Sequence, residues 1–186
     1  MTTEQQLVVA TNPDCGTLLG GGKPVDDSRG FRRCLGQYPT GVAVVTANYK
    51  GELIGMTVNS FASVSLDPPL ILWSIRRESR SVEAFTGAQH FVVNVLADDQ
   101  VLVSQWFATA HPERFELAPW SGGVGGAPLL HGSVAQLECE RVAVHEAGDH
   151  LILIGEVKQY AHFDGKPLAF SNGGYAQCLP REHVVN

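Results

Sequence analysis

The stretch GMTVNSFASVSLDPP, residues 55–69, carries the pattern from which the rest of the chain can be interpreted. In an extended conformation its side chains alternate between two faces. One face, from Met56 to Leu66, is mostly apolar and predicts a strand with one buried side. The other face, from Thr57 to Ser65, carries small polar side chains and one phenylalanine. The two prolines at the end of the stretch cannot donate to a ladder, so we expect the strand to stop there.

The small polar face has two interpretations. Hydroxyl and amide groups of little bulk allow the backbone N–H groups to approach a flat ligand or a phosphate. The alternative is an edge strand whose Ser/Thr-rich face is simply solvated. The residue types alone leave both open.

Length and charge limit the classes of partner. At 186 residues the chain fits one domain, and a chain of this size buries about 70% of its unfolded surface without help from a disulfide or a metal. The formal net charge is −6 and the basic residues are not clustered. We therefore expect no nucleic-acid or membrane-surface partner. No segment approaches the roughly 20 apolar residues that a membrane span needs.

The cysteines indicate a reducing compartment. Cys15, Cys34, Cys139 and Cys178 form no C-x-x-C pair and have no metal-ligand spacing with the seven histidines. We interpret them as structural thiols and expect no metal site. The apolar run at residues 7–10 is too short for a signal peptide, so we expect a cytoplasmic protein.

The first part of the chain predicts an arm followed by a folded domain. Residues 1–25 have weak periodicity and contain three consecutive glycines, which predicts an arm that is mobile or packs on a partner subunit. The folded domain is expected over 26–186. It begins with a helix capped by Asp27 or Ser28. A strand at 42–47, apolar enough to be buried on both sides, then forms a hairpin with the central stretch.

Further strands and two helices are expected after the central stretch. Strands are predicted at 70–75 and 91–96, with a short helix from Val82 between them. A helix at 101–108 should be capped by Asp98 or Asp99, and residues 109–130 are expected to be irregular.

The clearest hairpin spans 133–163. Its alternation changes phase near Glu140 and Arg141, which predicts a bulge there, and Ala147-Gly148-Asp149 forms its turn. Since strands outnumber helices and come mostly as hairpins, the predicted fold is mainly β, an antiparallel barrel with a few peripheral helices.

The chain contains no Ser-His-Asp, H-E-x-x-H or Walker pattern and no redox cysteine pair. Any redox chemistry would therefore depend on a cofactor that carries the electrons.

Two blocks of sequence resemble a known family. The pattern T-x-N-S-F-x-S-V-S-x-x-P-P, preceded by FRR…YPTGVAVVT, resembles the short-chain flavin reductases, the reductase components of two-component flavin-dependent monooxygenases. AGDHLILIGEV, residues 147–157, is similar to the second signature of that family. The resemblance covers about residues 31–175.

The resemblance implies a split barrel that dimerises and transfers hydride from NADH or NADPH to FAD or FMN. The reduced flavin would diffuse to a separate monooxygenase. Such a reaction depends mainly on proximity and alignment, so no catalytic side chain is expected. The resemblance implies flavin contacts from Met56, Thr57, Val58, Asn59, Ser60, Ser63, Val64, Ser65, Ser79, Arg80, Ser81, Phe91 and Asn94.

Two residues are expected to face the nicotinamide dinucleotide. The resemblance assigns His150 to this role, whereas a turn histidine by itself is usually only solvated. Tyr175 would stack on the nicotinamide or adenine, or else lie in the core or a dimer interface. Ser79 and Ser81 have a similar alternative, which is simple helix capping. No G-x-G-x-x-G is present, so the dinucleotide should bind in an open groove.

Two other functions remain open at this point. One is a split-barrel oxidase of the pyridoxamine-phosphate-oxidase type, which would favour a more basic phosphate site. The other is a non-enzymatic flavin carrier or sensor, which would keep its flavin and leave NADH unoxidised.

Overall fold

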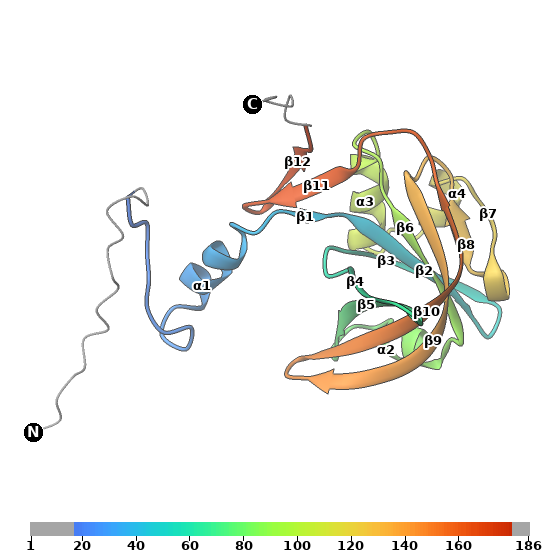
Figure 1. Cartoon of the computed structure of the whole chain (residues 1–186), viewed down its shortest axis with the longest axis horizontal. Helices are drawn as coiled ribbons and strands as arrows, with labels where there is room; N and C mark the ends of the chain where they lie inside the picture. The colour runs from blue at the N-terminus through green and yellow to red at the C-terminus, as the bar shows by residue number, and fades with distance from the viewer. Residues whose placement is uncertain (1–16, 180–186) are drawn as a thin grey trace, which may run out of the picture.

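Antiparallel pairing organises most of the chain, of which the computed structural model describes residues 17–179. The main sheet has seven strands in the order β3-β2-β6-β9-β10-β5-β4. It curls on itself, as Figure 1 shows. Its strands are β2 (Ala43–Tyr49), β3 (Glu52–Val58), β4 (Ala62–Leu66), β5 (Pro69–Arg76), β6 (His90–Val95), β9 (Ala135–Ala147) and β10 (His150–His162).

The core lies inside this curl. Residues 42–47 are all buried, as their nearly continuous apolar run predicts. Trp73 of β5 is also buried, and its ring packs edge-on against Phe85 and Phe91 with centroid separations of 4.9 and 6.0 Å. Burial of each phenylalanine contributes about 1.5–3 kcal/mol, so this aromatic cluster is a main support of the sheet.

The predicted hairpins are confirmed. The β2–β3 turn places Lys50 and Gly51 at φ values of 55° and 88°, the left-handed region that a two-residue turn requires. In the β9–β10 hairpin the pairing shifts between Ile154 and Gly155 and leaves Val142 as the extra residue. The bulge therefore lies next to the predicted position.

The described part of the chain contains four α-helices, of which the second and the third pack against strands of the main sheet. Asp27 caps the first of them by accepting a 2.7 Å hydrogen bond from the Gly30 N–H. Neither Asp98 nor Asp99 caps the third, because the cap position is Gln100, whose side chain instead accepts the Ala97 N–H. The helices are α1 (Ser28–Leu35), α2 (Val82–Gly87), α3 (Val101–Ala108) and α4 (Arg114–Leu117).

The segment expected to be irregular, 109–130, contains more regular structure than predicted. Besides α4 it holds a small two-stranded sheet of β7 (Trp120–Gly122) and β8 (Pro128–Leu130). A 3₁₀ turn, η1 (Val124–Gly126), joins the two strands.

The stretch 55–66 is not one strand, and this corrects the single extended segment that its alternation predicts. β3 and β4 are the two edges of the seven-stranded sheet, yet they follow each other in sequence. Residues 59–61 cross from one edge to the other without joining either ladder. The two edges are therefore joined by a linker and not by strand pairing, so the barrel is open, which confirms the predicted split barrel.

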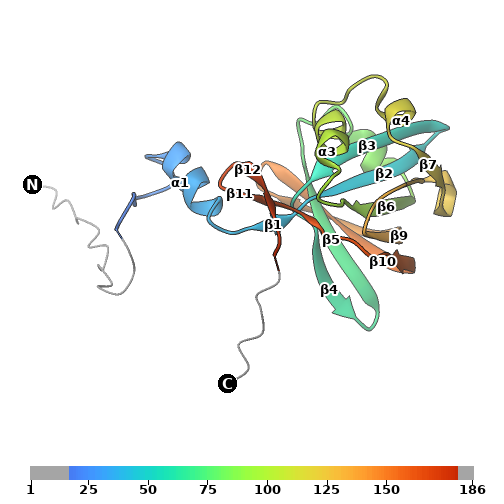
Figure 2. The same ribbon diagram turned by 90° about the horizontal axis from the view of Figure 1, so that it is seen from above.

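A second sheet projects from the main one together with α1 (Figures 1 and 2). It contains β1 (Thr40–Gly41), β11 (Leu168–Ser171) and β12 (Gly174–Gln177). Asn172 attaches the end of α1 to this sheet, since its N–H donates to the Gly36 carbonyl at 2.8 Å.

The predicted arm of residues 1–25 lies largely outside the described residues. Residues 17–25 are exposed and belong to no helix or strand.

Candidate functional site

The linker between β3 and β4 is the centre of the candidate site. The Ser60 hydroxyl accepts the Ser74 N–H of β5 at 2.9 Å and donates to the Ser74 carbonyl at 3.3 Å. One side chain thus satisfies a backbone pair that a strand would otherwise have bonded. The N–H groups of 59–61 lie outside both ladders and remain available to a ligand.

The β3 side of the linker is supported from below by α3. The Thr57 hydroxyl donates to the Ser104 carbonyl at 2.6 Å. Val58 is buried and Met56 is half-buried, both against the core. Residues 56–60 are expected to contact the flavin ring. Their side chains are therefore held in place, and only Asn59 among them is exposed.

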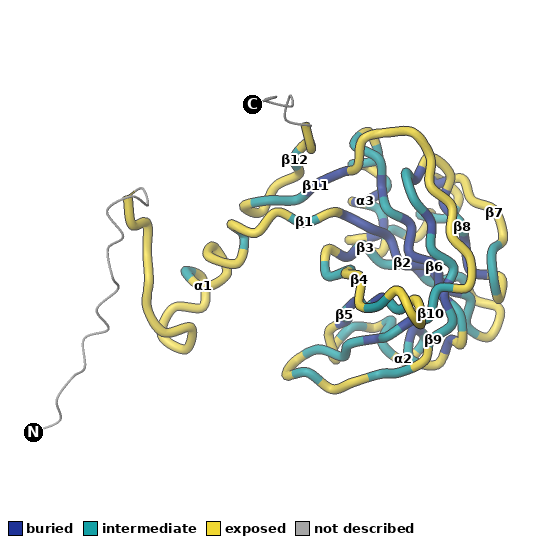
Figure 3. The backbone as a smooth tube through the Cα atoms, in the orientation of Figure 1, coloured by how far each residue is buried: buried dark blue, intermediate teal, exposed yellow. Residues whose placement is uncertain are grey.

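The β4 side is open to solvent. Ser63 and Val64 are exposed, and Ser65 uses its hydroxyl to accept the Asp67 N–H at 3.2 Å. Pairing with β5 shifts between Ser63 and Ser65, so Val64 is the extra residue of a bulge. Figure 3 shows the contrast, with β4 largely exposed beside the buried middle of the sheet.

The segment Ser79-Arg80-Ser81 forms a tight loop immediately before α2. The Ser79 hydroxyl accepts the Ser81 N–H at 3.3 Å, so the capping alternative holds in part for Ser79. Ser81 occupies the cap position of α2 without a side-chain cap bond. Arg80 is exposed, and the described residues give it no ion-pair partner. The loop therefore presents one free cation and two hydroxyls.

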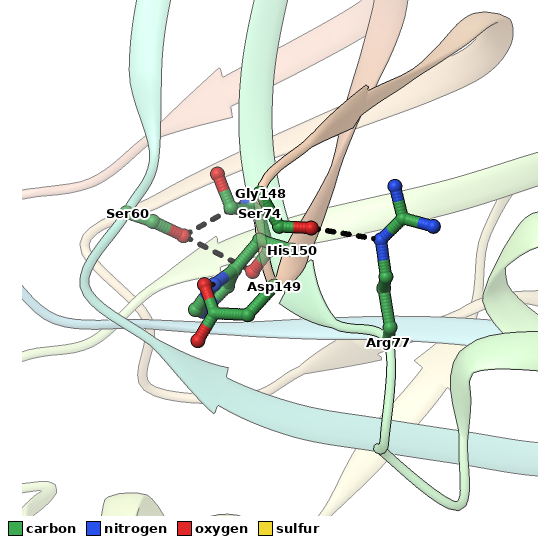
Figure 4. A network of polar contacts seen from close by, with 6 residues as sticks. All are labelled: Ser60, Ser74, Arg77, Gly148, Asp149 and His150. Carbon is green, nitrogen blue, oxygen red and sulfur yellow. Dashed lines mark hydrogen bonds and ion pairs between the residues drawn. The ribbon is translucent and has the colours of Figure 1, made fainter.

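The β9–β10 turn carries His150 at its end (Figure 4). His150 Nδ1 lies 2.7 Å from Asp149 Oδ1, and this hydrogen bond holds the pKa of Asp149 below its ordinary value. A carboxylate only accepts, so Nδ1 carries the proton and Nε2 is the nitrogen left for a ligand.

Arg77 fastens this turn to the end of β5. Its backbone N–H donates to the Asp149 carbonyl and its Nε donates to the Gly148 carbonyl, both at 3.0 Å. Its Nη2 lies 3.0 Å from Glu146 Oε2, and the hydrogen bond from Arg77 lowers the pKa of Glu146. The arrangement restricts where His150 can point.

β5 brings the expected flavin and nicotinamide residues together. Ser74, which Ser60 binds, pairs with Ile152 of β10, and Arg76 pairs with His150. Ser60 and His150 thus both neighbour β5, at register positions two residues apart. The 79–81 loop follows directly from the same end of β5.

Tyr175 lies on the other side of the linker. Its hydroxyl is 2.9 Å from the Ser104 hydroxyl, and its ring packs edge-on against Phe170 at 5.7 Å. Ser104 connects it to Thr57, so Tyr175 belongs to the β3 side of the site. The residue is 37% exposed and can be reached by a ligand.

Two expected flavin contacts are instead core residues, which corrects their assignment. Phe91 is 1% exposed and Asn94 has no exposed surface. The Asn94 amide donates to Val44 and Thr46 of the neighbouring strand, at 3.2 and 3.1 Å, and its oxygen accepts the Leu130 N–H. Both side chains are thus packed inside the chain and not at a surface where flavin could bind.

Three residues of this arrangement were not predicted from the sequence. Ser74, Arg77 and Ser104 position the expected site residues through hydrogen bonds from other elements. Ser104 has a local signal, because it is a polar residue in the otherwise apolar helix VLVSQWFA. The other two have none, since their roles depend on strand register.

The described part of the chain offers no group of histidine, cysteine or acidic side chains that could hold a metal ion. Within it, no helix is both long and apolar enough to cross a bilayer. Cys139 is buried, which raises the pKa of its thiol to about 12. This cysteine is therefore inert at neutral pH, as expected of a structural thiol.

Two pockets border the described residues, and the smaller one reaches the linker at Phe61. A cavity of about 480 Å³ borders α3 and the loop at 164–166, and one of about 40 Å³ lies beside Val42 and Phe61. Neither is lined by an expected flavin or nicotinamide residue. In a single chain the β4 side of the candidate site is an open surface, since Ser63, Val64 and Leu66 are exposed.

Comparison with known proteins identifies similar sequences over most of this fold. A family model described as "Flavin reductase like domain" matches residues 35–178. The chain is 49% identical over 152 residues to "FMN reductase (NADH) SmoA" of Agrobacterium fabrum, covering 82% of this chain and 87% of that protein. It is 35% identical over 159 residues to "Flavin-dependent monooxygenase, reductase subunit HsaB" of Mycobacterium tuberculosis, covering 84% and 85%.

Solved structures give the same result. Streptomyces globisporus NADH:FAD oxidoreductase SgcE6 superposes with a TM-score of 0.83 at 34% identity, covering 92% of this chain and 99% of that chain. The same oxidoreductase in complex with NAD and FAD fragments gives a TM-score of 0.81 at 37% identity, covering 86% and 96%.

Proposed function

The chain belongs to the family of flavin reductase like domains, and from this premise we propose how its residues support the reduction of FMN or FAD by NADH or NADPH. It is an NAD(P)H:flavin oxidoreductase. The bound nicotinamide supplies a hydride and the bound flavin accepts it. The protein's task is therefore to hold two rings face to face and to exclude water between them.

The observation behind the flavin assignment is the linker at 59–61. Its backbone N–H groups are outside both ladders, and its side chains are small except for Phe61. A flat ring bearing carbonyl and ring-nitrogen acceptors fits such an edge, because several N–H groups donate along one line. Thr57 and Ser60 are already fixed by Ser104 and Ser74, so the edge is ordered before a ligand arrives.

The flavin phosphate is assigned to the exposed residues beside this edge. Arg80 supplies a positive charge without a competing ion pair in the described residues. The Ser79 hydroxyl accepts from Ser81, so its own proton remains available to a phosphate oxygen. Ser63 and Ser65 extend the hydroxyl surface along β4. Support from α2 itself is small, since that helix has only six residues.

The nicotinamide dinucleotide is assigned to His150 and Tyr175, which lie on opposite sides of the linker. The Asp149 contact leaves His150 Nε2 free to bond the carboxamide or a phosphate oxygen of the dinucleotide. The exposed part of the Tyr175 ring offers a stacking surface. No proton transfer by either residue is required for a hydride to pass between the two rings.

A second copy of the chain would complete the site. α1 has no buried residue, although Phe31 and Leu35 place apolar surface on it, and the exposed Tyr38 follows it. β4 is an uncovered edge on which Leu66 is 93% exposed. Exposed apolar edges and helix faces of this kind mark protein interfaces. A homodimer would cover both, and would turn the open surface at the linker into an enclosed one.

The reduced flavin is proposed to leave for a separate monooxygenase. The reductase subunit of a flavin-dependent monooxygenase is among the relatives, in support of such a partner. We place the protein in the cytoplasm, where nicotinamide dinucleotides are available. The free thiols of Cys34, Cys139 and Cys178 are in keeping with a reducing compartment.

The flavin should behave as a substrate that comes and goes. Each neutral hydrogen bond contributes about 0.5–1.5 kcal/mol, so the few contacts assigned here give roughly micromolar affinity. The purified protein should lose its yellow colour on dialysis, and NADH oxidation should then rise with added FMN or FAD and saturate. A protein that stays loaded and ignores added flavin would instead be a carrier or a bound-flavin oxidase.

A further inference from the structure

A buried serine connects two elements on the β3 side of the candidate site. Ser104 of α3 has no exposed surface. Its hydroxyl lies 2.9 Å from the Tyr175 hydroxyl, and its carbonyl accepts the Thr57 hydroxyl at 2.6 Å. One residue of α3 therefore contacts both β12 and β3.

Burial of the Ser104 hydroxyl costs free energy, and in the described structure only the hydrogen bond with Tyr175 offsets this cost. Burial of a hydroxyl without a partner is unfavourable, and serine is a weaker helix former than alanine. The helix around it is apolar, with Val103 and Trp106 close in sequence. The bond to Tyr175 is the one recorded for the Ser104 hydroxyl, so this side chain is suited to fixing that tyrosine.

The hydrogen bond to Ser104 holds the Tyr175 side chain at its hydroxyl and leaves part of the residue accessible. The ring is held at its hydroxyl by Ser104 and along its side by the edge-on contact with Phe170. More than a third of the residue remains exposed. Without the hydroxyl bond, the ring would still contact Phe170 but could swing about its χ1 and χ2 angles.

We propose that Ser104 is a positioning residue, which holds the Tyr175 ring at the angle needed to stack on the nicotinamide. This inference rests on the proposed function, and it adds a residue that never touches a ligand. Thr57 bonds the backbone carbonyl of Ser104, whereas Tyr175 bonds its hydroxyl. Removal of the serine hydroxyl therefore removes the Tyr175 contact and keeps the Thr57 contact. Nicotinamide binding should weaken, and flavin binding should not.

The test compares Ser104→Ala with Ser133→Ala. Ser133 is a matched control, since it is also buried but its hydroxyl has no hydrogen-bond partner in the described structure. Calorimetric titration with NAD⁺ and with FMN gives both dissociation constants, and steady-state assays give KM and kcat. Loss of one neutral hydrogen bond predicts about a 3- to 10-fold weaker NAD⁺ affinity and a similar rise in KM for NADH in Ser104→Ala. The FMN constant should change less than about twofold.

Tyr175→Phe provides a second variant that removes the other partner of the same bond. It should reproduce the effect of Ser104→Ala on NAD⁺, and the double variant should add nothing further. Additive effects, unchanged NAD⁺ affinity, or equal losses for NAD⁺ and FMN would each overturn the positioning role. A wild-type protein without flavin-dependent NADH oxidation would instead overturn the proposed function, and this inference with it.

Discussion

The two edges of the main sheet are built in opposite ways. β3 is covered by α3, so closely that a side chain at Gly55 would meet the Phe107 ring at 2.5 Å. β4 has no such cover, and Val64 and Leu66 on it are 50% and 93% exposed. The same linker connects the two edge strands, and Figure 2 shows that they run apart on either side of it.

Because of this difference, substitutions on the two sides should have different effects: on stability at the covered side, and on ligand binding or subunit association at the uncovered side. On the covered side, β3 packs against buried groups such as Phe107, so substitutions that disturb this packing should affect the fold of each chain. On the uncovered side, His150 depends on exposed contacts from Asp149 and Arg77. Substitutions there should change ligand binding or subunit contacts while each chain stays folded.

The largest effect is expected at the covered edge. Gly55→Ala forces a methyl group against Phe107, a buried ring that cannot move aside. Overpacking of this kind costs about 1–3 kcal/mol. Chemical denaturation should show this loss for Gly55→Ala and almost none for Gly41→Ala, where an added Cβ meets nothing within 4 Å. Equal stability of the two variants would mean that β3 is not tightly covered.

His150→Ala should affect the nicotinamide and spare the flavin. Loss of one positioned group raises the activation free energy of the reaction with NADH by roughly 1–3 kcal/mol, and kcat/KM for NADH falls accordingly. His145→Ala is the control, because His145 is an exposed histidine on the same hairpin. An equal loss of FMN affinity in His150→Ala would show that this histidine supports the hairpin and does not face the dinucleotide.

A charge on the uncovered edge should weaken the dimer. Sedimentation of the wild type should give about 40 kDa, twice the 20.0 kDa of one chain. Leu66→Lys should weaken self-association about tenfold, since it buries a charge in the proposed interface. Leu102→Lys, at an exposed leucine on α3, should leave the mass unchanged. A wild-type monomer with full reductase activity would count against an interface site.

The smallest effect concerns pH and the hairpin turn. The hydrogen bond from Arg77 lowers the pKa of Glu146 below its ordinary 4.5. The pair therefore stabilises the fold above that ordinary value, and its contribution is lost as the pH falls through the lowered pKa. Both groups are exposed, so the gain is small. Glu146→Gln should unfold slightly more easily than wild type at about pH 7, and this difference should shrink at about pH 3. A difference that does not change with pH would show that the Arg77–Glu146 pair is not its source.

The hairpins were predictable because their residues alternate with period two. The phase change near Glu140 located the bulge at Val142 to within two residues, since a bulge is a local event in one strand. The apolar run at 42–47 likewise indicated burial on both faces, which the structure confirms.

The break in the central stretch was not predictable from that pattern. The alternation of residue types continues through Ser60 and Phe61, but neither residue pairs with a neighbouring strand. The break depends on Ser74 of β5, whose N–H donates to the Ser60 hydroxyl. The burial of Phe91 and Asn94 depends on strand order in the same way. A polar residue in a strand pattern does not indicate whether a second strand or solvent covers it.

Hydrogen–deuterium exchange with and without FMN is the most direct test of the site at the linker. The dialysed protein should gain protection in peptides that cover residues 56–66 and 79–81 when FMN is added. Peptides that cover 97–103 and 132–134, beside the 480 Å³ cavity, should exchange as before. Protection at the cavity, with unchanged exchange at the linker and at the 79–81 loop, would contradict the account.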